Sequence, residues 1–405
     1  MNKSKLLALN INGMLVQAFF WFGSCSYMAF MVATLIDYGW SAGGAAAALT
    51  VMAVIAMIVQ PFYGFLSDKY LSEKILSITF FVISAVCFFL LPLSLNTGNM
   101  ALILINMAGI TVTGMQINGL LDSWIVGLKQ EFNSINYGLI RGCGSFAYAL
   151  AAQMMGMITV SFSHDLRMWI GAGVLLLGAV SAITFRSAKR INKISAQQQE
   201  NMPVSRLKGI EALRIVFSSK KYNLLLAVSF FLLLCNSAIG TLLQILIRDY
   251  GGTTVHVGTV AAVMAASEVP FMFLMAFFIK KIGYKKLIII CAVVYVIRML
   301  LTASVSTVNS LINVQFLQGL TYAVLLPVAM NYFTQIVDER VRSTAVTIFT
   351  AVTASLTGIL GNLITSAFLL SGFSVQSTLI FFIFSAFIGL LLALYGSFRK
   401  IWTHG

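Results

Sequence analysis

The chain has 405 residues, of which 59% are hydrophobic and only 9% are charged. Soluble globular domains carry about 25% charged residues, so this composition excludes a soluble globular protein and indicates a chain that uses lipid as its solvent. The formal net charge is +14, which in a soluble protein would suggest nucleic acid as a partner. The placement of the basic residues, described below, argues against nucleic acid.

Twelve apolar segments, six before a long polar interval and six after it, are each long enough to cross a membrane. A hydrocarbon core of about 30 Å needs about 20 helical residues, and lipid offers an open backbone no hydrogen-bonding partner, so we predict a helix for each. The first follows Lys3 and Lys5 and is longer than a signal-peptide core, so we expect it to be retained. The segments are 11–36, 42–66, 75–95, 101–127, 137–160, 168–185, 224–247, 257–279, 287–305, 311–336, 344–370 and 377–398.

The polar interval 186–223 divides the chain. It contains the basic, glutamine-rich run RSAKRINKISAQQQE and is the only long polar stretch in the sequence. We predict that residues 1–185 form an N-terminal six-helix bundle, 186–223 a cytoplasmic linker and 224–405 a C-terminal six-helix bundle. The fold class is then an all-α membrane protein with twelve transmembrane helices in two six-helix bundles.

Lysine and arginine predict how the helices are oriented. If the N-terminus lies in the cytoplasm, 22 of the 26 basic residues fall in cytoplasmic loops or tails, and two, Arg167 and Arg248, fall in outside loops. This positive-inside bias predicts a multi-pass protein of the cytoplasmic membrane with both termini in the cytoplasm. The net charge therefore reflects topology and attraction to anionic lipid headgroups.

Four ionisable residues lie well inside apolar segments: Asp122, Arg141, Glu268 and Arg298. An unpaired charge near the middle of the membrane costs at least about 2.5–3.5 kcal/mol, so such residues face a polar cavity or one another. Glu268 and Arg298 lie 15 residues before and after Gly283, so two antiparallel helices carry opposite charges at matched depth. The acid and the base of the first half flank the turn between the fourth and fifth segments in the same way. Each half therefore holds one acid and one base that can reach each other.

Two interpretations of these charges remain open. In the first, they are two structural ion pairs that fix contacts between helices. In the second, which we favour, they line a central cavity between the bundles, where a polar solute binds and a buried carboxylate beside a movable arginine exchanges a proton. Polar residues on the same helices suit a hydrogen-bonding pocket for an uncharged solute. They are Asn106, Thr111, Gln116, Asn118, Gln315, Gln318 and Asn331.

A charged turn between the second and third segments carries a family resemblance. Its sequence GFLSDKYLSEK, residues 64–74, resembles the loop 2–3 signature of the major facilitator superfamily, and FIKKIGYKK at 278–286 is a weaker echo in the second half. The resemblance implies twelve helices in two halves. It also implies that Gly64, Asp68 and Lys69 form a conformational switch that stabilises one state of the carrier.

A narrower resemblance is to the lactose permease-like branch, which includes oligosaccharide, nucleoside and phenylpropionate transporters. An acid late in helix 4, Asp122, followed by YGLIR opening helix 5, resembles the acid–arginine pair that binds sugar in that branch. Tyr148 stands where the branch has a stacking tryptophan. Glu268 in SEVP resembles its helix 8 glutamate. The resemblance thus implies that Asp122, Arg141, Tyr148 and Glu268 bind the substrate.

Proton symport is a further implication of this resemblance, and it would rest on Glu268, Arg298 and Asp122. Arg298 in VIRMLL resembles the helix 9 arginine of the branch. On helix 10, however, neutral residues replace the permease's lysine, histidine and glutamate. Three alternatives follow. Glu268 or Asp122 carries the proton, or transport is coupled in another way than in the permease, or the protein is a facilitator. The neutral residues are Gln315, Gln318 and Thr321.

We therefore predict a secondary active transporter for a small polar solute, with protons and the lipid bilayer as partners, acting as a monomer. The alternative is a drug or metabolite exporter of the same fold, which the absence of proline from segment 137–160 disfavours. A membrane enzyme or receptor is a third class. We expect neither an enzyme nor a bound cofactor or metal, because no nucleophile–base set, nucleotide loop or metal-ligand spacing of cysteine or histidine is present.

Overall fold

The computed structural model describes residues 3–69, 71–132, 135–186, 209–399 and 401–402. Within these ranges every regular element is a helix, and twelve spans are long and apolar enough to cross a membrane. The predicted fold class, an all-α membrane protein with twelve transmembrane helices, is confirmed. The limits of the linker stay a prediction, because residues 187–208 lie outside the described ranges.

The N-terminal half contributes six spans, two of which are divided into shorter helices. The first span consists of α1 (Lys3–Met28) and α2 (Met31–Asp37). The fourth consists of α5 (Met100–Thr113), the 3-10 turn η1 (Gly114–Gln116) and α6 (Ile117–Glu131). The remaining spans are α3 (Ala42–Lys69), α4 (Glu73–Thr97), α7 (Tyr137–Ser161) and α8 (His164–Thr184).

The C-terminal half also divides its fourth span by a 3-10 turn, as the N-terminal half does. That span consists of α14 (Val308–Val314), η2 (Gln315–Leu317) and α15 (Gln318–Ile336). The fifth consists of α16 (Arg342–Thr350), the π-helical η4 (Ala351–Leu356) and α17 (Thr357–Leu370). The other elements are α10 (Gly209–Ser218), α11 (Lys220–Asp249), α12 (Thr254–Ile282), α13 (Tyr284–Ser304), η3 (Glu339–Val341) and α18 (Val375–Phe398).

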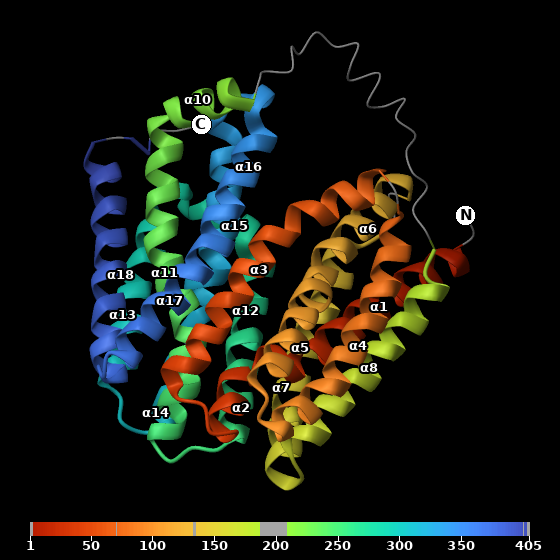
Figure 1. Ribbon diagram of the computed structural model, residues 1–405. Coiled ribbons are helices and arrows are strands. Elements are labelled where there is room, and N and C mark those ends of the chain that lie inside the picture. The colour runs from red at the N-terminus through yellow and green to blue at the C-terminus, as the bar shows by residue number, and fades with distance from the viewer. Residues whose placement is uncertain (1–2, 70, 133–134, 187–208, 400, 403–405) are drawn as a thin grey trace.

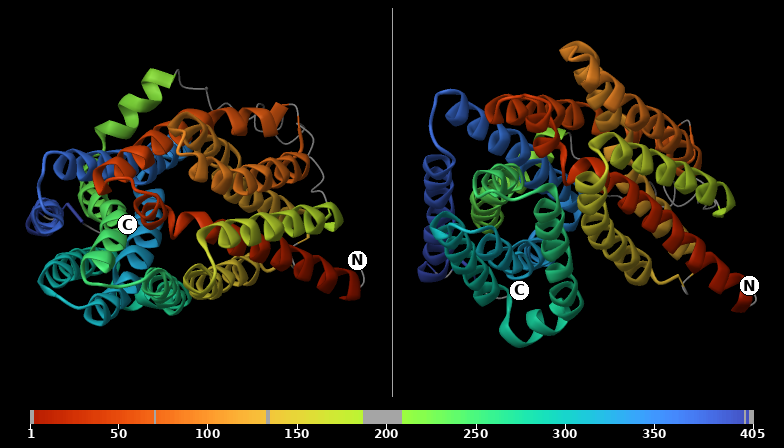
Figure 2. Two further views of the ribbon diagram at one scale, coloured as in Figure 1. Left: turned by 60° about the horizontal axis from the view of Figure 1, so that its bottom comes forward. Right: turned by 90° about the horizontal axis from the view of Figure 1, so that it is seen from below.

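The helices form two groups that are close together at one end of the molecule and diverge toward the other (Figures 1 and 2). We call the end where α8 ends and α11 begins the linker end, and the end that carries α2, α14 and the α11–α12 turn the far end. The helix α3 packs beside α17 and diverges from α16 toward the linker end (Figure 1). The tight boundary between the halves therefore lies at the far end.

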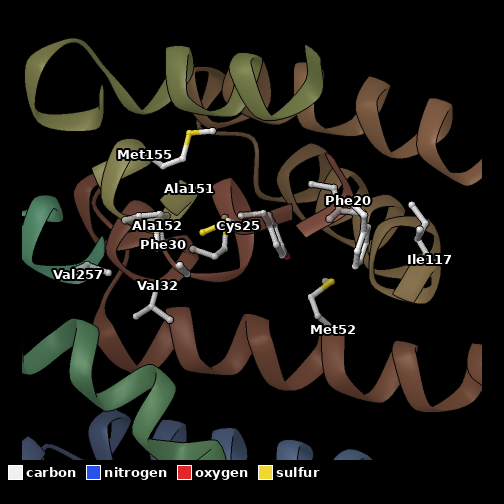
Figure 3. Close-up of a cluster of buried hydrophobic side chains, with 14 of the residues drawn as sticks. Phe20, Cys25, Phe30, Val32, Met52, Ile117, Ala151, Ala152, Met155 and Val257 are labelled. Carbon is white, nitrogen blue, oxygen red and sulfur yellow. The ribbon is translucent and has the colours of Figure 1, made fainter. Parts of the chain in front are cut away.

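Apolar packing joins the halves at that end. One buried core runs through the N-terminal helices and continues into the parts of the C-terminal helices nearest the far end. Val257 of α12 and Ala152 of α7 both belong to this shared core (Figure 3). A second buried core lies within the C-terminal half alone. Among the described residues, the buried apolar packing shared by the two halves is therefore concentrated at the far end.

Small residues permit this close approach. A Cβ atom on Gly258 of α12 would overlap the carbonyl oxygen of Ala152 on α7. On α3, a Cβ on Gly43 would lie 2.7 Å from Cγ of Leu370 on α17. The hydroxyl of Ser366 on α17 donates to the carbonyl oxygen of Gly43 at 2.9 Å. Two helix pairs, α7–α12 and α3–α17, thus hold the halves together.

The turn at Gly283 sets the relative height of the charged residues in the C-terminal half. Its φ of +82° lies in the left-handed region that favours glycine, and it separates α12 from α13 by a single residue. Because the turn is so short, α12 and α13 run antiparallel. Glu268 on α12 and Arg298 on α13 therefore lie at similar depth, as their spacing in the sequence predicts.

Candidate functional site

A cavity of about 630 Å³ lies between the two halves and is lined by both. Its volume is within the range of about 300–1,000 Å³ that is usual for small-molecule sites. The helices α1 and α7 supply one wall, and α11, α12 and α15 supply the other. The lining residues with polar or aromatic side chains are Trp21, Arg141, Ser145, Tyr148, Gln244, Glu268 and Tyr322.

The N-terminal wall presents Arg141 and Tyr148. The Nε atom of Arg141 lies 3.6 Å from Oδ1 of Asp122, and the two side chains are 30% and 29% exposed. Asp122 does not itself line the cavity, so it acts on the cavity through Arg141. Tyr148 packs edge-on against Trp21, with 5.8 Å between ring centres. Trp21 itself lines the cavity.

The C-terminal wall presents Glu268, whose Oε1 accepts a hydrogen bond from Nε2 of Gln318 at 2.9 Å. Gln318 Oε1 in turn accepts a hydrogen bond from Nη1 of Arg298. The sequence predicted that this acid and this base could reach each other, but no ion pair joins them among the described side chains. The amide of Gln318 lies between them, because Glu268 faces the cavity whereas Arg298 points into its own half.

Arg298 is fully buried and is held by neutral acceptors. Oε1 of Gln315 accepts from Nε at 3.1 Å and from Nη2 at 2.8 Å. Nη1 also donates to Asn236 Oδ1 and to Thr321 Oγ1, each at 3.2 Å. A buried charge is tolerated only when its hydrogen bonds are made, and these oxygens make them. Arg298 is therefore bound by Asn236 and by three neutral residues of the tenth span, Gln315, Gln318 and Thr321.

A second polar cluster links the halves at the far end. Asp37, at the end of α2, accepts a hydrogen bond from Arg248 near the end of α11. The same carboxylate lies 2.9 Å from Nε2 of His164 on α8. These three residues border a separate cavity of about 340 Å³. The ion pair between Asp37 and Arg248 adds a polar contact to the apolar boundary.

Arg167 was predicted to lie in an outside loop, and that placement is wrong. The helix α8 begins at His164, and the Arg167 side chain is fully buried inside the N-terminal half. Its guanidinium donates to Thr34 Oγ1 at 2.6 Å and to Thr159 Oγ1 at 3.1 Å. The serine before the helix, Ser163, caps it by accepting from the backbone N–H of Leu166, and this N-cap was the available sequence signal.

The predicted switch residues are only partly described. Gly64, Asp68 and Lys69 lie in the last turns of α3, so the predicted turn is helical up to Lys69. Of these three residues, the structure describes the backbone only. Their role as a switch stays a prediction.

A sequence model of the MFS_1 like family matches residues 13–384, which is most of the chain. The chain belongs to the MFS_1 like family. Its predicted membership of the major facilitator superfamily, in the lactose permease-like branch, is confirmed, and the protein is a multi-pass membrane protein.

Two curated relatives come from bacteria. The chain is 25% identical over 259 residues to "Maltose permease" of Geobacillus stearothermophilus, a match that covers 64% of this chain and 62% of the relative. It is also 25% identical over 232 residues to "Uncharacterized transporter YwbF" of Bacillus subtilis (strain 168), covering 57% and 55%. The matches thus span about three fifths of the length of these relatives.

Solved structures show the same fold. The nucleoside transporter NupG, as a D323A mutant, superposes with a TM-score of 0.81 at 16% sequence identity, covering 96% of this chain and 99% of that chain. A bacterial homolog of the human lysosomal transporter Spinster superposes with a TM-score of 0.71 at 12% identity, covering both chains fully. At these identities the likeness shows the fold alone.

Proposed function

We propose that the protein is a secondary transporter that moves a small polar solute, such as a sugar or a nucleoside, across the cytoplasmic membrane by alternating access. The observation that carries this proposal is the shared cavity, because Arg141 of one half and Glu268 of the other both line it. A site between two halves is exposed to one side and then to the other when the halves rock. The maltose permease and the nucleoside transporter NupG, to which the chain is similar, are named for such solutes.

The chemistry of the walls supports an uncharged solute with hydroxyl groups. The guanidinium of Arg141 can only donate hydrogen bonds, whereas a carboxylate at Glu268 accepts them, so a hydroxyl group can be bound at either wall. Tyr148 and Tyr322 offer flat apolar surfaces to a ring. Asp122 balances the charge of Arg141 across 3.6 Å, so the N-terminal wall attracts neither anions nor cations strongly.

The two ends of the molecule support an assignment of sides. Lysine and arginine are concentrated toward the linker end, so we place that end and both termini in the cytoplasm. The far end, where α7 packs against α12 and α3 against α17, then faces outward. The conformation described is closed toward the outside. We propose that transport requires these two contacts to open.

We propose that Glu268 or Asp122 carries the proton if transport is coupled. These are the carboxylates among the described residues at the site, and Arg298 is bound by neutral oxygens alone. Proteoliposomes that contain a pH-sensitive dye would report a proton flux started by solute. Solute uptake without any proton flux would make the protein a facilitator.

The function is tested by solute uptake into proteoliposomes, after a thermal-shift screen of the purified protein against sugars, nucleosides and aromatic acids. Glu268→Gln and Arg141→Gln are expected to abolish uptake while leaving the protein folded in the membrane. Glu211→Gln, which changes an exposed carboxylate of α10, is the matched control and should transport normally. Full uptake by both site variants would overturn the site, and failure of the parent protein to bind or transport any compound of these classes would overturn the solute class.

A further inference from the structure

Arg141 belongs to a closed ring of four side chains. Nε1 of Trp21 donates to Oε1 of Gln17 at 3.0 Å, and Nε2 of Gln17 donates to Oδ1 of Asp122 at 3.3 Å. Asp122 faces Nε of Arg141, and the Arg141 guanidinium carbon lies 4.7 Å from the centre of the Trp21 ring. Each member of the ring therefore contacts the next. The sequence patterns did not single out Gln17.

The ion pair alone is too loose to orient the guanidinium. The distance of 3.6 Å from Nε of Arg141 to Oδ1 of Asp122 exceeds that of a hydrogen bond. The cation–π contact with Trp21 supplies the missing constraint, because a cation is attracted to the face of an indole ring. Trp21 is in turn fixed by Gln17, which is fully buried.

Gly144 provides the space that Trp21 occupies. It lies on α7 one turn from Arg141, and a Cβ atom there would lie 2.5 Å from Cδ1 and 3.1 Å from Nε1 of Trp21. An alanine at this position would push the indole off α7. The sequence thus places a glycine where the ring must approach the helix that carries Arg141.

We propose that Gln17, Trp21 and Gly144 are positioning residues that hold the Arg141 guanidinium toward the solute. This inference rests on the proposed transport function. Trp21 also touches Tyr148, so the same indole sets the spacing between the cationic group and an aromatic ring on one wall. The wall therefore selects a ring-shaped, uncharged solute that carries an acceptor oxygen at its edge, which matches a pyranose or a nucleoside better than an extended chain.

Four variants test the proposal by uptake kinetics in proteoliposomes: Gln17→Met, Gly144→Ala, Trp21→Phe and Trp21→Leu. Gln17→Met and Gly144→Ala should raise KM about 3- to 10-fold with little change in the maximal rate, as expected when one oriented hydrogen bond or contact is lost. Trp21→Phe keeps an aromatic face under Arg141, so it should be milder than Trp21→Leu. Gly173→Ala on α8, where a Cβ meets no atom within 4 Å, is the matched control.

A double-variant cycle separates positioning from a general structural role. If Gln17 acts through Arg141, then Gln17→Met should weaken solute binding, measured as a Kd by thermal-shift titration, much less in an Arg141→Lys background than in the parent, because the two effects are coupled. Equal changes in both backgrounds, or unchanged KM in Gln17→Met and Gly144→Ala, would overturn this inference while leaving transport intact. If the parent protein took up no solute, that result would instead refute the proposed function.

Discussion

Alanine at position 258 should open the far end of the molecule. Gly258 lies against the backbone of α7, and an added Cβ would lie 3.1 Å from the carbonyl carbon of Ala152 and closer still to its oxygen. Gly156 faces α12 in the same way, with 2.9 Å from a Cβ to the carbonyl oxygen of Thr254. These neighbours are backbone atoms, which cannot rotate away as the end of a side chain can. The helices must separate to accept the methyl group.

The size of the effect follows from the location of the overlap. Overpacking of this kind costs about 1–3 kcal/mol. The cost falls on the conformer in which α7 and α12 touch, and it is absent when the far end is open. A perturbation that destabilises one of two states shifts their ratio by its full free energy, here by about 5- to 150-fold toward the open state.

Labelling of a single cysteine measures this shift. Ala33 is 4% exposed, and its backbone N–H donates to Oε1 of Gln244 across the boundary at 2.9 Å. In a background without native cysteines, Ala33→Cys should react slowly with a membrane-impermeant maleimide added outside. Gly258→Ala should raise this labelling rate at least about fivefold, the lower end of the shift. Gly358→Ala, where a Cβ meets no atom within 4 Å, should leave it unchanged.

An unchanged labelling rate in intact Gly258→Ala protein would refute the reasoning. It would mean that the far end does not open, or that α7 and α12 separate without exposing position 33. Labelling by the same reagent from the linker side provides a check on orientation. Faster labelling from that side would reverse the assignment of the cytoplasmic end.

Two further predictions concern the polar clusters. Asp37→Asn removes the ion pair between α2 and Arg248 of α11. Because the Arg248 side chain is 42% exposed, this ion pair contributes about 0.2–1 kcal/mol to the closed state. The rate of maleimide labelling at position 33 should therefore rise by only about 1.4- to 5-fold. A larger rise in labelling rate in Asp37→Asn than in Gly258→Ala would contradict the expectation that the ion pair contributes less than the helix packing. Gln318→Leu removes one hydrogen bond from Arg298 and one from Glu268, each worth about 1.5–3 kcal/mol, and should lower the unfolding temperature in detergent. An unfolding temperature equal to that of Gln376→Leu, an exposed control, would contradict it.

The fold was predictable from the sequence because lipid leaves few choices. Each apolar run had to become a helix, and the twelve predicted segments correspond to the twelve spans. The short turn at Gly283 fixed the depth of Glu268 and Arg298, which depends only on the rise per residue. Depth is therefore available from spacing along the chain.

The direction in which a side chain points was not predictable in the same way. Glu268 and Arg298 share a depth, yet one lines the cavity and the other is fully buried, because the rotation of each helix depends on packing against its neighbours. Arg167 was misplaced for a related reason. Its helix begins with a polar turn that hydropathy excludes from the span, although the capping by Ser163 includes it.

Arg298 determines the direction of the hydrogen bonds in the C-terminal wall. Because a guanidinium has donors only, the oxygen of the Gln318 amide must face Arg298, and its NH₂ group must then face Glu268. The amide cannot turn over without placing two donors together in a buried site. Glu268 is thus always offered a donor from its own half. Under the proposed function, its remaining oxygen is available to accept a hydrogen bond from a solute hydroxyl in the cavity, so Gln318 favours the proposal that Glu268 acts there as an acceptor.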